Sequence, residues 1–334
     1  MNIPTLRGTP VHTTVIQVEQ IISIRDTLSI SNANLLANRT ASTSVNRDTT
    51  QQAITTASAS RWADFSLEVL TEVYKNILDQ MVMPPRGVRS GTFDIRRVQD
   101  ATTMFIEHLS PPLEEPISRG AAFLGGQSNR QFPAVVVKVS NDIKLNKGVE
   151  TYNPPLSFVT GDGARTLVVG FFLHARAWNS NKLLHTETAM AKRPLLRIAK
   201  YCLLAHTRYG FIMTMDEIVV VRIKGTVFDT KAPCHVEWQA VPWVAQGPYE
   251  LTVCLSMWSL VMLSLDDLRL STSPSHYMPP PHHIPHPRSL NIWWHYQIPG
   301  GFFYRHPSSG QREADLPEGA TFEEGPTETS SSTS

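Results

Sequence analysis

The sequence predicts one mixed α/β domain over residues 61–270, between a mostly disordered N-terminal arm (1–60) and a disordered C-terminal tail (271–334). Apolar residues make up 41% of the 334 positions, which is enough to close a hydrophobic core. Helix-periodic segments and β-branched runs follow one another through the middle of the chain. Both ends are instead poor in large apolar residues, so they gain too little from burial to become ordered.

The first predicted elements are two amphipathic helices. Residues 28–60 are rich in Ser, Thr, Asn and Gln and are expected to form a flexible arm. Apolar residues then recur at helical spacing from Trp62 to Met81, and Pro84-Pro85 is expected to end this helix. A second helix is predicted after Gly91 and is expected to end at Pro111-Pro112, before a glycine-containing loop over residues 118–129.

The rest of the domain is predicted to alternate between strands and helices. Three successive strands come first, with a turn at Asp162-Gly163 between the second and third. A helix, a hairpin, a further strand and a last buried helix follow. The predicted strands are 134–139, 156–160, 166–172, 209–214, 217–224 and 234–241, and the predicted helices are 188–205 and 250–268.

The C-terminal tail is Pro- and His-rich over residues 271–306 and acidic over 311–334. Neutral imidazole is the commonest zinc donor, so its histidines suggest a metal site: His276, His282, His283, His286 and His295. Most of them lie in a stiff, proline-rich run without cysteine partners. We therefore expect an exposed linker or docking strip, with no metal site.

Composition narrows the class of protein. The net charge of +1, from 30 basic and 29 acidic residues, provides no overall field for nucleic acid or a membrane surface. The three cysteines form no CxxC pair, which favours a reducing compartment. The apolar run Leu251–Leu265 is shorter than the ~20 residues of a membrane span, and residues 1–15 lack a signal peptide. We expect an intracellular protein, cytoplasmic or nuclear, that has no membrane partner.

Two segments resemble a known family. Residues 195–223 (LLRIAKYCLLAHTRYGFIMTMDEIVVVRI) and 250–264 (ELTVCLSMWSLVMLS) are similar to a family of uncharacterised fungal proteins with a PD-(D/E)XK nuclease-like domain. The predicted order of helix, strand, strand, strand, helix, strand is the connectivity of that nuclease core. The resemblance covers about residues 62–268 and is most specific in its second half. It implies a central mixed sheet flanked by helices.

The resemblance also implies where a catalytic site would lie. Active members hold Mg²⁺ with an Asp on the second core strand and a Glu-x-Lys on the third. In this sequence Leu156 falls at the Asp position, Phe171 and Leu173 fall at the Glu and Lys positions, and Arg197 replaces a helical Gln. Phenylalanine and leucine cannot bind a divalent cation. The resemblance therefore implies a degenerate domain without nuclease activity or cofactor, which serves as a binding or scaffold module.

Two other functions stay open. One is a Mg²⁺-dependent DNA endonuclease with a relocated acidic site, although Asp before Gly is first of all a turn signal. Its candidate carboxylates are Asp142, Glu150 and Asp162, and its candidate bases are Lys138, Lys144 and His174. The other is a protein-interaction domain that uses the C-terminal strip. The sequence identifies neither a substrate nor a partner.

A nucleic-acid contact would have to come from one helix. Lys192, Arg193, Arg197 and Lys200 lie within the predicted helix 188–205, where side chains three and four apart share a face. Such a face can contact phosphates. Because the whole chain is not basic, an ordinary solvated face is the simpler interpretation.

Overall fold

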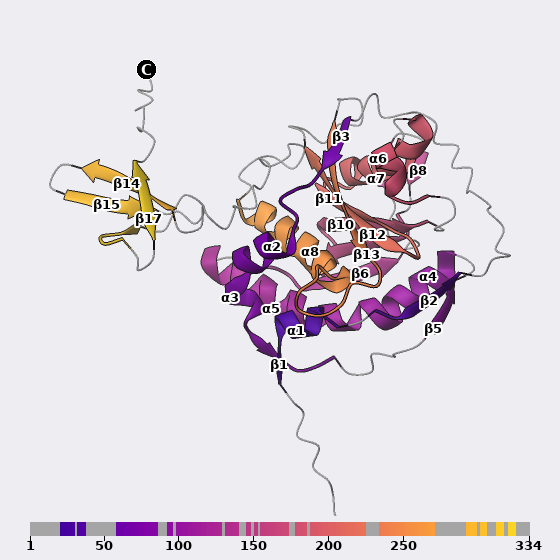
Figure 1. The fold of residues 1–334 in the computed structure, drawn as a ribbon, viewed down its shortest axis with the longest axis horizontal. Coiled ribbons are helices and arrows are strands. Elements are labelled where there is room, and N and C mark those ends of the chain that lie inside the picture. Colours follow the sequence, from indigo (N-terminus) through magenta and orange to yellow (C-terminus); the bar gives the residue numbers. More distant parts are fainter. Residues whose placement is uncertain are drawn as a thin grey trace, which may run out of the picture.

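The chain folds around a central seven-stranded mixed sheet flanked by helices (Figure 1). The structure is a computed structural model, and it describes residues 21–30, 32–37, 58–85, 92–95, 98–128, 131–139, 145–147, 150–152, 154–173, 178–185, 188–224, 234–270, 292–298, 301–305, 312–316 and 320–324. Among these residues, no helix is long and apolar enough to cross a membrane.

The sheet has the strand order β3-β13-β12-β11-β10-β9-β6. Its strands are β3 (Ser58–Arg61), β6 (Val135–Val139), β9 (Leu156–Thr160), β10 (Thr166–Phe172), β11 (Tyr209–Met213), β12 (Glu217–Lys224) and β13 (His235–Pro242). The pairs β10–β11 and β13–β3 are parallel, and the other pairs are antiparallel. The six strands predicted from the sequence are confirmed, with small shifts at their ends.

One face of the sheet is covered by α7 (Ala189–Leu204), which connects the parallel strands β10 and β11. Parallel neighbours require such a crossover. Thr188 caps the helix, because its hydroxyl accepts a hydrogen bond from the Ala191 backbone N–H. The helix packs closely on β11, since a Cβ added to Gly210 would lie 2.7 Å from Ile198 Cγ1. The predicted helix 188–205 is confirmed.

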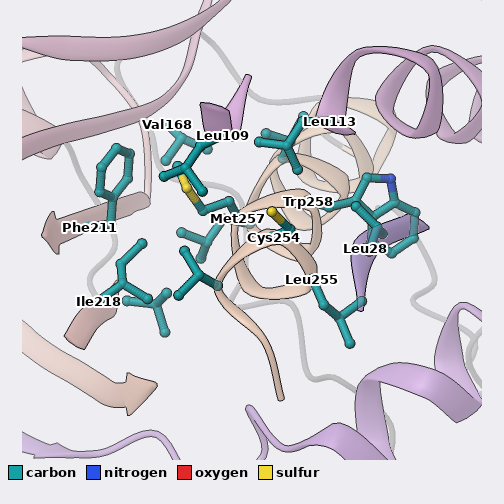
Figure 2. Close-up of a cluster of buried hydrophobic side chains, with 14 of the residues drawn as sticks. Leu28, Leu109, Leu113, Val168, Phe211, Ile218, Cys254, Leu255, Met257 and Trp258 are labelled. Atoms are coloured by element: carbon teal, nitrogen blue, oxygen red, sulfur yellow. The ribbon is translucent and has the colours of Figure 1, made fainter. Parts of the chain in front are cut away.

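The opposite face is covered by α8 (Val253–Leu270) and α5 (Pro111–Ser128). Figure 2 shows Phe211 and Ile218 of the sheet facing α8, with Leu109 and Leu113 beside the helix. The indole N–H of Trp258 on α8 donates a 3.0 Å hydrogen bond to the Pro116 carbonyl oxygen of α5. The larger of two hydrophobic clusters therefore lies between the sheet and these helices.

The region before β6 differs from the prediction. The first helix begins at Leu67, after the capping residue Ser66, rather than at Trp62, and it consists of α2 (Leu67–Val73) and α3 (Lys75–Leu78). The second predicted helix is β5 (Thr92–Ile95), α4 (Val98–Met104) and a π-helical turn (Phe105–Leu109). Pro111 then begins α5, which occupies the expected loop, because a proline in the first helical turn has no N–H to leave unpaired.

Part of the expected N-terminal arm belongs to the folded body. Ile24 and Leu28, on α1 (Ile24–Leu28), are both 0% exposed and lie in the larger core cluster. β3 is an edge strand of the main sheet. Short pairs of strands join β1 (Ile22–Ser23) to β4 (Met81–Val82) and β2 (Asn34–Ala37) to β5. The predicted disordered arm, residues 1–60, therefore includes segments that belong to the fold.

Part of the expected C-terminal tail is also ordered. β14 (Ile292–Ile298), β15 (Gly301–Arg305), β16 (Arg312–Glu313) and β17 (Thr321–Glu324) form a four-stranded sheet, drawn in yellow in Figure 1. His295 lies among the rings of Phe302, Tyr304 and Phe322 and is 3.3 Å from Glu324 Oε1. The other histidines of the tail lie outside the described residues. The aromatic residues, which pair across neighbouring strands, explain why this segment has secondary structure.

Candidate functional site

The positions implied by the family resemblance lie on β9 and β10, but on opposite faces of the sheet. Leu156 is 1% exposed and packs in the core cluster beneath α8. Phe171, also 1% exposed, packs in the second cluster beneath α7. Side chains alternate between the two faces of a strand, so these two positions cannot contribute ligands to one ion.

Phe171 lies in an apolar and aromatic environment. Its ring meets the Tyr201 ring edge-on, with centroids 6.1 Å apart. The Arg197 guanidinium lies 4.7 Å from the Phe171 ring centroid and donates hydrogen bonds of 3.1 and 3.0 Å to the Tyr201 hydroxyl oxygen. Leu173 packs against the same cluster. An arginine over aromatic rings stabilises packing, and it repels a metal cation.

Ser157 of β9 lies on the same face of the sheet as Phe171. It pairs with Val169 of β10 on one side and Lys138 of β6 on the other. The side chain is 1% exposed, and its hydroxyl has no hydrogen-bond partner among the described residues. A hydroxyl at this position is a poor ligand for Mg²⁺, which prefers carboxylate oxygens.

Asp162 lies at the turn between β9 and β10. Its carboxylate accepts a 2.6 Å hydrogen bond from the Thr160 hydroxyl and a 3.0 Å hydrogen bond from the Ala164 backbone N–H. These two bonds hold the pKa of Asp162 below its ordinary value. Phe171 is at the far end of β10, about 15 Å or more away at ~3.3 Å per residue. Asp162 is therefore a turn residue.

The other candidates for a relocated nuclease site form no cluster in the described part of the chain. Lys138 reaches the turn after β9, where a Cβ added to Gly163 would be 3.6 Å from its Nζ. The backbone of Glu150 is in β8 (Glu150–Tyr152), which pairs with β7 (Leu145–Lys147). Asp142, Lys144 and His174 lie outside the described residues. No described group of three or more His, Cys, Asp or Glu residues is placed to hold a metal ion.

The four basic residues of α7 do not form a uniform solvated face. Arg193 is exposed and Lys192 is half-buried. Arg197 is held by Tyr201 and Phe171, and Lys200 is only 8% exposed. The helix α6 (Asn181–His185) contacts α7 and adds the exposed Lys182 and His185. The exposed basic side chains are therefore at the N-terminal half of α7 and on α6.

A buried ionic cluster that the sequence analysis missed lies on β12 and β13. Arg222, with a 1% exposed side chain, donates two hydrogen bonds to Glu237 Oε2, at 2.7 Å from Nε and 2.5 Å from Nη2. Lys224 Nζ lies 2.6 Å from Glu237 Oε1. Burial alone would raise the pKa of Glu237, but the hydrogen bonds from Lys224 and Arg222 outweigh it and lower the pKa. The sequence signal for this cluster was a charged residue within each of two largely apolar strands, Arg222 in β12 and Glu237 in β13.

A second buried ion pair joins the sheet to α8. Arg208 Nε is 3.5 Å from Asp267 Oδ2, and both side chains are at most 8% exposed. Arg208 also donates a 2.6 Å hydrogen bond to the Ile223 carbonyl oxygen. Burial, and then the nearby Asp267 carboxylate, raise the pKa of Tyr209 well above its ordinary value. These charges stabilise the junction of β11, β12 and α8.

These observations define the class of the protein as mixed α/β, with a central seven-stranded sheet flanked by helices. Comparison of the chain with models of protein families, with curated proteins and with solved structures found no match.

Proposed function

We propose that the chain is a PD-(D/E)XK-like binding module without nuclease activity. The order α5, β6, β9, β10, α7, β11 supports the proposal, because it is the helix, strand, strand, strand, helix, strand order of that core. The parallel pairing of β10 with β11 across α7 is in agreement with it. The small hairpin β7–β8 is an insertion between the first two of these strands.

The packing of Phe171 is the observation that carries the proposal. The ring stands where the resemblance expects the metal-binding glutamate, and it contacts Tyr201 and the Arg197 guanidinium. Leu173, at the lysine position, packs in the same cluster. Neither side chain can bind a divalent cation or assist proton transfer, so the proposed role is binding.

The ligand we propose is nucleic acid, bound through its phosphates to the exposed basic residues of α6 and α7. Arg193 and Lys182 are exposed, and Lys192 is half-buried. Each phosphate contact should add about −0.9 to the slope of log K against log salt on duplex DNA. Since few side chains contribute, binding should be weak and independent of sequence.

The test is a gel-shift experiment in EDTA at two salt concentrations, with a parallel cleavage assay on supercoiled and single-stranded DNA in Mg²⁺ or Mn²⁺. We expect no cleavage, and binding that weakens with salt and with Arg193→Glu. Lys75→Glu is the matched control. This substitution makes the same charge change on α3, where Lys75 pairs with the exposed Asp79.

Three outcomes would contradict the proposal. Metal-dependent cleavage that Asp162→Ala or Glu150→Ala abolishes would establish the relocated nuclease site. Equal binding by Arg193→Glu and Lys75→Glu would remove α7 as the contact, and no binding at all would favour the protein-interaction alternative.

A further inference from the structure

A histidine and two serines meet at the β3 edge of the sheet, away from the positions described above. His235 Nδ1 is 2.7 Å from the Ser58 hydroxyl oxygen, and His235 Nε2 is 2.7 Å from the Ser60 hydroxyl oxygen. β3 and β13 pair in parallel, with Ser58 opposite His235 and Ser60 opposite Glu237. The two serines share one face of β3, and they hold the imidazole ring from both sides.

The two hydrogen bonds cannot have the same direction when the imidazole is neutral. A neutral ring carries one N–H, so one nitrogen donates and the other accepts. One serine therefore accepts from the ring, and the other donates its hydroxyl proton to the unprotonated nitrogen. A histidine activates a serine nucleophile when the serine donates its hydroxyl proton to the unprotonated ring nitrogen and a third group orients the ring from the other nitrogen.

Positive charge lies beside these residues. Lys224 is opposite His235 in the register of β12 and β13, and its side chain is 37% exposed. Its ammonium has three donors, one of which is used by Glu237 Oε1 at 2.6 Å. Arg222 contacts the other oxygen of the same carboxylate. Glu237 is thus neutralised by its two partners, and the ammonium can face a developing negative charge.

We propose that Ser60 is a nucleophile, that His235 is its general base, and that Ser58 is a positioning residue that accepts the Nδ1–H hydrogen bond. Ser60, rather than Ser58, is assigned as the nucleophile because it is opposite Glu237, which Lys224 and Arg222 contact. The substrate class is carboxylic esters. This inference does not depend on the proposed binding of nucleic acid.

In the reaction, Ser60 Oγ forms a bond to the carbonyl carbon of the ester while its proton moves to His235 Nε2. The carbon–oxygen bond to the alcohol then breaks, and the alcohol leaves with the proton from Nε2. Water repeats the sequence with the imidazole as base, which releases the carboxylic acid and restores the serine.

The experiment is labelling of the full chain with a fluorophosphonate, followed by intact mass and peptide mapping. The serine oxygen forms a bond to phosphorus, fluoride leaves, and the proton moves to the imidazole. We expect the label on Ser60, with none on Ser60→Ala. His235→Gln should slow labelling about 100-fold or more, which is the lower range for a general base.

Further variants separate a positioning role from a structural one. Ser58→Ala should slow labelling, because the ring loses the group that fixes its tautomer, and Ser58→Thr, which keeps a hydroxyl, should restore the rate. Ser66→Ala removes a serine that only caps α2, and it should label like the wild type. Labelling at another serine, or an unchanged rate in His235→Gln with a native circular dichroism spectrum, would overturn the proposal.

Discussion

The substitution Glu237→Gln should destabilise the fold by about 3 kcal/mol at pH 7. It leaves Arg222, whose side chain is 1% exposed, without its counter-charge. Removal of one partner of a buried pair costs about 3–5 kcal/mol, and the glutamine oxygen still accepts one hydrogen bond, so the lower value applies. The contact with Lys224 adds less than about 1 kcal/mol, because that side chain is 37% exposed. Urea unfolding followed by circular dichroism measures the difference.

The same substitution has a predicted pH dependence. The pKa of Glu237 is lowered in the folded state, so its contribution to stability is complete above the ordinary value of 4.5. That contribution is lost as the pH falls through the lower folded value, because the carboxylate becomes protonated in both states. The difference between wild type and Glu237→Gln should therefore be largest at neutral pH and should shrink below about pH 4.5.

A matched control separates this cluster from ordinary surface charge. Glu115 pairs with Arg119 along α5, and the two side chains are 47% and 54% exposed. Glu115→Gln should change the free energy of unfolding by less than about 0.5 kcal/mol. A loss below about 1 kcal/mol for Glu237→Gln, or a loss that stays constant from pH 7 to pH 4, would refute the reasoning.

Further predictions concern packing and thiol reactivity. Gly170→Ala should destabilise by about 1–3 kcal/mol, since the new Cβ would lie 2.1 Å from Phe211 Cζ in the core. Gly126→Ala, in α5 with nothing within 4 Å of the added Cβ, should stabilise by up to about 1 kcal/mol, and denaturant melts of both variants compare them directly. All three cysteines are buried, and burial raises the pKa of Cys254 to about 12. A thiol-reactive dye should therefore modify none of them in native protein within minutes at pH 8, and all of them in urea.

The six predicted strands and the helices α7 and α8 were predictable because their side chains repeat at a clear period. The run 166–172 is apolar and follows the turn signal Asp162-Gly163, and it is β10. The helix 188–205 begins at a capping threonine and is α7. Where periodicity, caps and turns agree, local preference and tertiary structure select the same element.

The misassigned segments were those where tertiary contacts override local preference. Pro111-Pro112 is a stop signal after one helix but also a start signal for the next, and only the packing of α5 on α8 decides between them. Ile24 and Leu28 look isolated in a polar region, yet both are buried against the core. Ser58 and His235 are 177 residues apart, so no local pattern could place them together.

The helix α8 illustrates how polar contacts specify an apolar element. Its residues are buried on every side from Thr252 to Asp267, so hydrophobic burial alone leaves its rotation and position along the sheet poorly defined. Polar contacts at three positions along the helix remove this freedom. Thr252 donates a 2.5 Å hydrogen bond to the Leu28 carbonyl oxygen, Trp258 donates to Pro116, and Asp267 pairs with Arg208. The first two contacts are hydrogen bonds to different elements, so rotation or sliding of the helix would leave a buried polar group without its hydrogen bond, which costs about 1–3 kcal/mol per group.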